Sequence, residues 1–287
     1  MNMARSLALP RDIVGVTVGP IAHDIDARWL MAYAAGLGET DARYYDTLAP
    51  GGPAPHPIFP VCYEWPILLA VRAQTTPEEI ALRSVHATHD LTVHRAPQAG
   101  DTLNASARVT GLAHRRAGTL MTVRVETVDA RGRRVTTSDY GSVYRGVGFE
   151  GEDTGVGPEG RGGSGMPAGA GLLPVEVPAG LAHVYTECAR IWNPIHTDVA
   201  VARAAGLADI ILHGTATLAL AVSQVLHHAT ADPRAVKRVS ARFTGMVPLP
   251  SRLTIRAAEA SEGKAFLFEA AGEDGTTVLS GGALHFA

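Results

Sequence analysis

The sequence predicts an α+β fold made of two copies of a helix-plus-sheet unit, and three observations support this prediction. Segments with the helical period come first, and segments with the two-residue period of antiparallel strands follow them. The same order recurs in the second half of the chain, and a glycine-rich stretch separates the two halves. We therefore predict a first unit over residues 1–145, a linker over residues 146–176 and a second unit over residues 177–287.

The first half opens with helical patterns. Ile25, Trp29 and Tyr33 fall on one face of a helix predicted over residues 24–38, which an aspartate can cap and glycines can end. A second helix is predicted over Cys62–Ala73. Alternating apolar residues and turn signals then predict four strands, at Ser84–His94, Thr102–Leu112, Leu120–Val128 and Val135–Tyr144.

The second half repeats this order with a more apolar helix. Residues His213–His228 are apolar on almost every face, which is typical of the buried axis of a domain. Strands are predicted after it, at Arg238–Phe243, Leu253–Glu259, Ala265–Ala271 and Val278–Phe286.

The two halves also match in detail. Residues 90–103 and 240–253 each consist of a strand, a proline-containing loop and a second strand over the same length. Between the halves, residues 146–171 are crowded with glycine and show no periodicity. Such a long connection is unusual inside one compact domain, and it is explained if it must cross from one copy to the other.

Composition narrows the range of functions. The net charge of −3 comes with scattered basic residues, so a nucleic-acid partner is not expected. No apolar run approaches the roughly 20 residues of a membrane span, and the sequence MNMARSLALPRDIV lacks the features of a secretory signal. Cys62 and Cys188 are too few and too scattered for a disulfide framework or a zinc site, so we expect buried free thiols and a cytoplasmic location.

One polar segment stands out before the long apolar helix. It reads Asn193-Pro194-Ile195-His196, and His213-Gly214 follows at the expected start of the helix. A helix N-terminus is electropositive, and a glycine lets a ligand approach its free N–H groups closely. The pattern therefore predicts an imidazole near a place that can hold a carbonyl group, which suits proton transfer.

These residues resemble the hydratase/dehydratase signature of the MaoC-like enzymes, also called (R)-specific enoyl-CoA hydratases. The resemblance rests on Tyr185, the Asn193–His196 motif, Asp198 and His213-Gly214. The first half resembles the degenerate N-terminal copy of that family. The residues that carry this second resemblance are Tyr33-Ala34, Gly36, Gly38, Phe59-Pro60, His94-Arg95 and Gly100-Asp101.

The resemblance implies a double hot-dog fold, in which each antiparallel sheet wraps around a long helix. It also implies hydration of a 2-enoyl thioester, or dehydration of a 3-hydroxyacyl thioester, carried by CoA or an acyl-carrier protein, without a metal or redox cofactor. A fused pair of units would already bury the interface that single-unit relatives share, which leaves a homodimer open.

Carried over by the motif, His196 takes the acid–base role, Asn193 positions water, and the N–H of Gly214 binds the thioester oxygen. His213 stands beside that glycine, in contact with the substrate or in a structural role. The family has an aspartate where this chain has Ile191, and Ser-Gly where it has Ala189-Arg190.

Three explanations of the missing aspartate remain open. Glu187 takes over its role, because Asp198 is expected to cap a helix. Alternatively, His196 acts alone while Arg190 holds a carboxylate or a CoA phosphate. Finally, the protein binds a thioester without hydrating it, or it catalyses another enolate reaction on the same fold.

Overall fold

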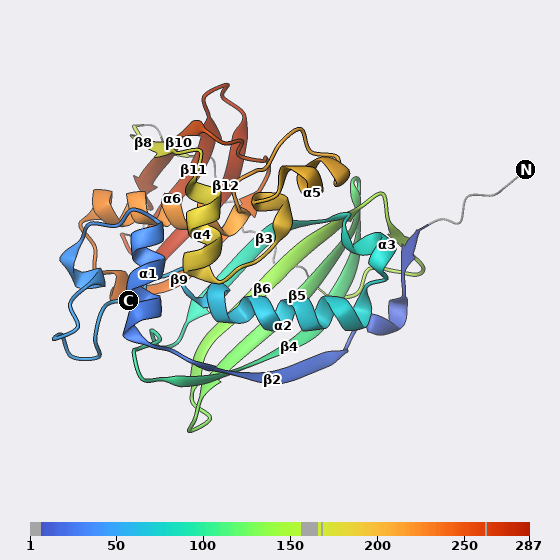
Figure 1. The fold of residues 1–287 in the computed structure, drawn as a ribbon, viewed down its shortest axis with the longest axis horizontal. Coiled ribbons are helices and arrows are strands. Elements are labelled where there is room, and N and C mark those ends of the chain that lie inside the picture. Colours follow the sequence, from blue (N-terminus) through green and yellow to red (C-terminus); the bar gives the residue numbers. More distant parts are fainter. Residues whose placement is uncertain (1–6, 156–165, 168, 262) are drawn as a thin grey trace, which may run out of the picture.

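The computed structural model describes residues 7–155, 166–167, 169–261 and 263–287, in which ten strands form one continuous antiparallel sheet around two long helices (Figure 1). Part of the predicted linker and the first six residues of the N-terminal segment lie outside the described residues. The sheet has the order β2-β4-β5-β6-β3-β9-β12-β11-β10-β8. Its first five strands come from the first half of the chain, and its last five come from the second half.

The first unit contains the predicted elements and one further edge strand. Its principal elements are β2 (Thr17–Asp24), α1 (Ala27–Gly36), α2 (Pro60–Thr75), β3 (Ser84–Val93), β4 (Thr102–Arg115), β5 (Gly118–Asp129) and β6 (Arg134–Arg145). Its minor elements are β1 (Ala8–Leu9), α3 (Glu78–Ala81) and β7 (Gly148–Phe149). As the sequence predicts, Asp26 caps α1 by accepting a hydrogen bond from the Trp29 backbone N–H at 2.6 Å.

The second unit repeats this arrangement. Its elements are β8 (Gly171–Val177), α4 (Leu181–Ala189), α5 (Val199–Ala204), α6 (Gly214–Ala229), β9 (Val236–Phe243), β10 (Ser251–Glu259), β11 (Ala265–Gly272) and β12 (Thr277–Phe286). Helix α6 has ten buried residues among its sixteen, which confirms the prediction of a buried axis. None of the helices in the described part of the chain is both long and apolar enough to span a bilayer.

The two units meet at the antiparallel pair β3–β9. Asp90 lies directly opposite Ser240, and these are the first residues of the two matching sequence segments. Equivalent residues therefore face each other across an approximate two-fold axis. Beside that axis, Arg238 Nε donates to Asp90 Oδ1 at 2.8 Å and links the two halves of the sheet.

Helices α1 and α4 pack against each other on the same axis. The hydroxyl oxygens of Tyr33 and Tyr185 lie 3.3 Å apart, one from each copy. Gly36 makes the close approach feasible, because a Cβ at that position would lie 2.8 Å from Cys188 Cβ. Both cysteines are free thiols, and Cys62 is buried.

The edge strands β2 and β8 were not predicted from the sequence. Strand β8 begins at Gly171, inside the segment predicted as linker, and pairs with β10. Only Val175 and Val177 are buried in it, and Pro174 is acceptable because an edge strand leaves some N–H groups unpaired. Two buried residues are too few to give the alternating apolar pattern by which a strand is predicted from sequence.

Candidate active site

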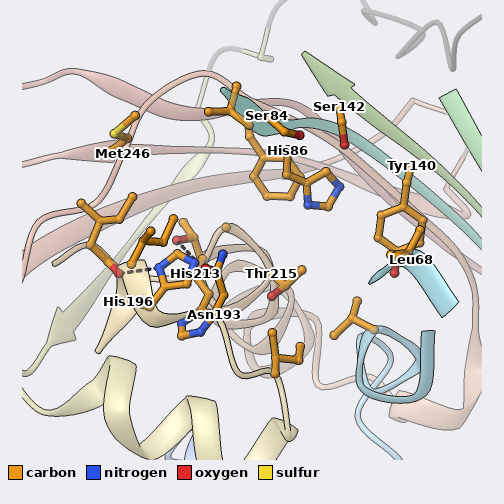
Figure 2. A pocket seen from close by; sticks show the side chains of 18 of the residues that line it. Leu68, Ser84, His86, Tyr140, Ser142, Asn193, His196, His213, Thr215 and Met246 are labelled. Atoms are coloured by element: carbon orange, nitrogen blue, oxygen red, sulfur yellow. Dashed lines mark hydrogen bonds between the residues drawn. The ribbon is translucent and has the colours of Figure 1, made fainter. Parts of the chain in front are cut away.

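A cavity of about 380 Å³ lies between the two units, and both of them line it. The first unit contributes α2 and the strands β3, β5 and β6. The second unit contributes the segment around His196, the start of α6 and the residues that follow β9. Figure 2 shows His196, His213 and Asn193 on one side of this cavity and Tyr140 and Leu68 on the other.

His196 is held in one tautomer at the edge of this cavity. Its Nδ1 lies 2.8 Å from the backbone oxygen of Ile211, which can only accept a hydrogen bond, so the ring donates from Nδ1. Its other nitrogen, Nε2, is then an unprotonated base. Burial lowers the pKa of His196 to about 4, so the ring is neutral at pH 7.

His213 packs against the face of the His196 ring. The two rings stack with their centroids 3.7 Å apart, and His213 Nε2 lies 3.1 Å from Thr186 Oγ1. Burial, and then the neighbouring His196, hold the pKa of His213 well below its usual value. Two neutral imidazoles therefore sit together in a place that disfavours positive charge.

Gly214 is the first residue of α6, and Asn193 lies in the segment that precedes His196. Both line the cavity. The first N–H groups of a helix have no acceptor within the helix, so the Gly214 amide is suited to a ligand oxygen. A Cβ on Gly214 would lie 3.2 Å from the Phe243 ring, so tight packing is a second reason for glycine here.

The resemblance described above places Ile191 where the MaoC-like signature has an aspartate. It lines the cavity, is 5% exposed and belongs to the main apolar core. An isoleucine can neither accept a proton nor orient water. Asp198 caps α5 by accepting from Ala200 N at 2.8 Å, as the sequence predicts, and it is not among the residues that line the cavity.

Two of the predicted site residues lie elsewhere. Glu187 is exposed on α4 and does not line the cavity, because Tyr185 and Thr186 occupy the inward face of that helix. Arg190 ends α4 in a left-handed conformation, with φ of 58°. Its guanidinium lies 4.0 Å from the centre of the Trp29 ring. The structure therefore brings neither side chain to the cavity.

A polar cluster from the first unit forms the opposite wall. Tyr140 lines the cavity and donates its hydroxyl to Glu64 Oε2 at 2.6 Å. Glu64 is fully buried on α2, and Ser138 donates to its Oε1 at 2.7 Å. Burial raises the pKa of Glu64 to about 7, against the opposing effect of these hydroxyl donors.

His86 extends this wall because β3 is irregular. The pairing of β3 with β6 shifts register between His86 and Thr88. This bulge places both His86 and His89 against Tyr140, with ring centroids 5.3 Å and 4.7 Å from it. His86 lines the cavity, whereas His89 is 1% exposed and lies behind it.

The site residues predicted from the sequence all lie in the second unit, and Tyr140, Glu64 and His86 were not among them. A carboxylate inside the apolar helix of residues 62–73 was a readable signal, because an isolated buried charge requires partners. The bulge that turns His86 inward had no signal in the sequence.

Two family models match the chain, one in each half. Residues 182–279 match the MaoC-like domain, and residues 12–138 match the dehydratase domain region of the FAS1-like family. No curated protein sequence matches the chain.

Solved structures share the fold over nearly the whole chain. A MaoC-like dehydratase from Phytophthora capsici has a TM-score of 0.80 and 20% identity, with 96% of each chain covered. The peroxisomal multifunctional enzyme type 2 from Drosophila melanogaster has a TM-score of 0.73 and 22% identity over 94% of this chain and 48% of its own. A protein from Mycobacterium tuberculosis described as a double hot-dog fold has a TM-score of 0.58 and 15% identity, with 95% of each chain covered.

Proposed function

The protein is a double hot-dog member of the MaoC-like dehydratases, and we propose that it is a hydro-lyase acting on a 2-enoyl or 3-hydroxyacyl thioester of CoA or a carrier protein. The observation that carries the proposal is the tautomer of His196. Its Nδ1–H is fixed by the Ile211 oxygen, so Nε2 is a neutral base in the same cavity as the first N–H of α6.

In the hydration direction, His196 Nε2 removes one proton from a water molecule as the water oxygen bonds to the β-carbon. The electron pair of the carbon–carbon double bond moves toward the thioester, and negative charge develops on its oxygen. The Gly214 N–H at the start of the sixteen-residue helix α6 stabilises that charge. The imidazolium then returns its proton to the α-carbon, which restores the thioester and the neutral ring.

The low pKa of His196 favours this last step. An imidazolium in a site that disfavours charge is a strong acid, so it returns a proton readily to the enolate carbon. Asn193 lines the cavity on the same side, and its amide can hold the water. One base and one amide dipole then suffice, which accounts for a site that has Ile191 in place of a carboxylate.

The test is loss of enoyl absorbance when the protein is incubated with a panel of 2-enoyl-CoA esters. His196→Ala should abolish turnover, because a general base contributes about 10²–10⁴-fold. His114→Ala is the matched control, since His114 is an exposed histidine of β4 that does not line the cavity. Full activity of a folded His196→Ala variant would eliminate this mechanism.

A second function is favoured by Ile191 itself, which gives the motif position an apolar, 5% exposed side chain. The alternative is a protein that binds an acyl thioester without hydrating it. Absence of turnover across the panel, together with micromolar binding of saturated acyl-CoA esters in calorimetry, would identify this function.

A further inference from the structure

The cavity wall that the first unit contributes carries hydrogen-bond acceptors at His86 and Tyr140. His86 Nε2 lies 3.0 Å from the backbone oxygen of Thr88, which can only accept, so His86 donates from Nε2. Burial lowers the pKa of His86 to about 3, so the ring is neutral and Nδ1 is an acceptor. Figure 2 shows the His86 ring in the cavity wall, and its Nδ1 is not one of the fully buried atoms that lack a hydrogen-bond partner.

Tyr140 likewise presents a hydrogen-bond acceptor to the cavity. Above pH 7, where Glu64 is ionised, the Tyr140 hydroxyl donates its only proton to Glu64, so its oxygen has only acceptor capacity left for a ligand. Ser138 and Thr136 also donate to Glu64, at 2.7 Å and 3.4 Å, and these bonds hold the carboxylate in place. Two acceptors without a free proton of their own therefore line one side of the cavity.

Apolar side chains lie beside this wall. Met121 and Val123 line the cavity beside Tyr140 and are 3% and 4% exposed. On the other side, Met246 is 44% exposed, and Figure 2 shows it on the side where His196 lies. If a thioester binds with its carbonyl at Gly214 and its carrier arm toward the exposed Met246, its acyl group extends toward Tyr140.

A plain alkyl chain would displace water from both acceptors and leave them without partners, which is unfavourable. A hydroxyl or phenol on the acyl group would supply the missing proton. We infer that His86 Nδ1 and Tyr140 Oη select an acyl thioester that carries a hydrogen-bond donor away from the thioester end. This inference rests on the thioester function proposed above, and it adds the class of acyl group.

Binding of saturated esters tests the inference without any need for turnover. Two matched pairs are measured by calorimetry at pH 8, where Glu64 is ionised: phenylpropanoyl-CoA against para-hydroxyphenylpropanoyl-CoA, and hexanoyl-CoA against ω-hydroxyhexanoyl-CoA. In at least one pair, the hydroxylated ester should bind about tenfold more tightly, as one well-made buried hydrogen bond predicts. Equal binding within both pairs would overturn the inference.

Two variants locate the preference. His86→Phe removes the acceptor and should abolish the difference within a pair, whereas His94→Phe changes an exposed histidine outside the cavity and should retain it. If His86→Phe weakens both esters of a pair equally, the carrier arm occupies this side and the inference is wrong. If neither ester binds to the wild-type protein, the thioester function itself fails and the inference fails with it. The wild-type comparison is decisive even where a variant does not fold.

Discussion

The pH dependence of turnover tests the state of the His196 ring. The ordinary histidine pKa of 6.5 falls to about 4 here. This change corresponds to about 3 kcal/mol in favour of the neutral ring. At pH 5.5, an imidazole of pKa 6.5 would be about one-tenth neutral, whereas the His196 ring would remain almost wholly neutral. We therefore expect kcat/KM for hydration to stay nearly constant between pH 8 and about pH 5.

The assay is loss of enoyl absorbance at limiting substrate, with circular dichroism at each pH to show that the protein is folded. This control is needed because His89 and His196 have lowered pKa values, each to about 4. The unfolded chain binds more protons than the folded one below pH 6.5, so stability falls as the pH decreases toward 4. A tenfold loss of kcat/KM by pH 5.5 in a protein that is still folded would refute the buried neutral base.

Three further variants have expected outcomes. Burial raises the pKa of Glu64 from 4.5 to about 7 in the folded protein, so folding favours its protonated form. The contribution of this group to the free energy of unfolding is fully present below pH 4.5 and is lost as the pH rises through 7. Glu64→Gln should therefore gain about 3 kcal/mol of unfolding free energy relative to wild type between pH 4.5 and 8, and an unchanging difference in urea titrations would contradict this. Ile191→Asp should raise turnover of a plain enoyl-CoA by about 10²-fold and lower the free energy of unfolding by about 3 kcal/mol. Unchanged kinetics in a folded variant would argue that a carboxylate at this position has no access to the reacting atoms. Gly214→Ala should reduce kcat/KM at least about tenfold, because the new Cβ would lie 3.2 Å from the Phe243 ring and would shift the Gly214 N–H from the thioester oxygen. The free energy of unfolding should change by no more than about 1 kcal/mol. A loss of stability with an unchanged rate would show that the glycine is needed for packing alone.

The duplicated fold could be predicted because both copies keep strong periodic signals. The long helix after His213 is apolar all round, and the matching segments that start at Asp90 and Ser240 meet as partners across the sheet. The edge strands escaped prediction because an edge strand needs few buried residues, as β8 shows with two.

The candidate site was only partly predictable. The motif identified His196, Asn193 and Gly214, which the structure places around one cavity. The opposite wall could not be predicted, because a bulge in β3 decides that His86 faces inward, and bulges depend on the pairing of strands. Glu187 appeared available in the sequence, yet the phase of α4 directs it to solvent.

A structure with a bound saturated acyl-CoA would test the central claim most directly. We predict that the thioester oxygen lies within hydrogen-bond distance of the Gly214 N–H, and that the β-carbon faces Nε2 of His196. A thioester that leaves this nitrogen without access to the β-carbon, or one that binds outside the cavity between the two units, would contradict the account.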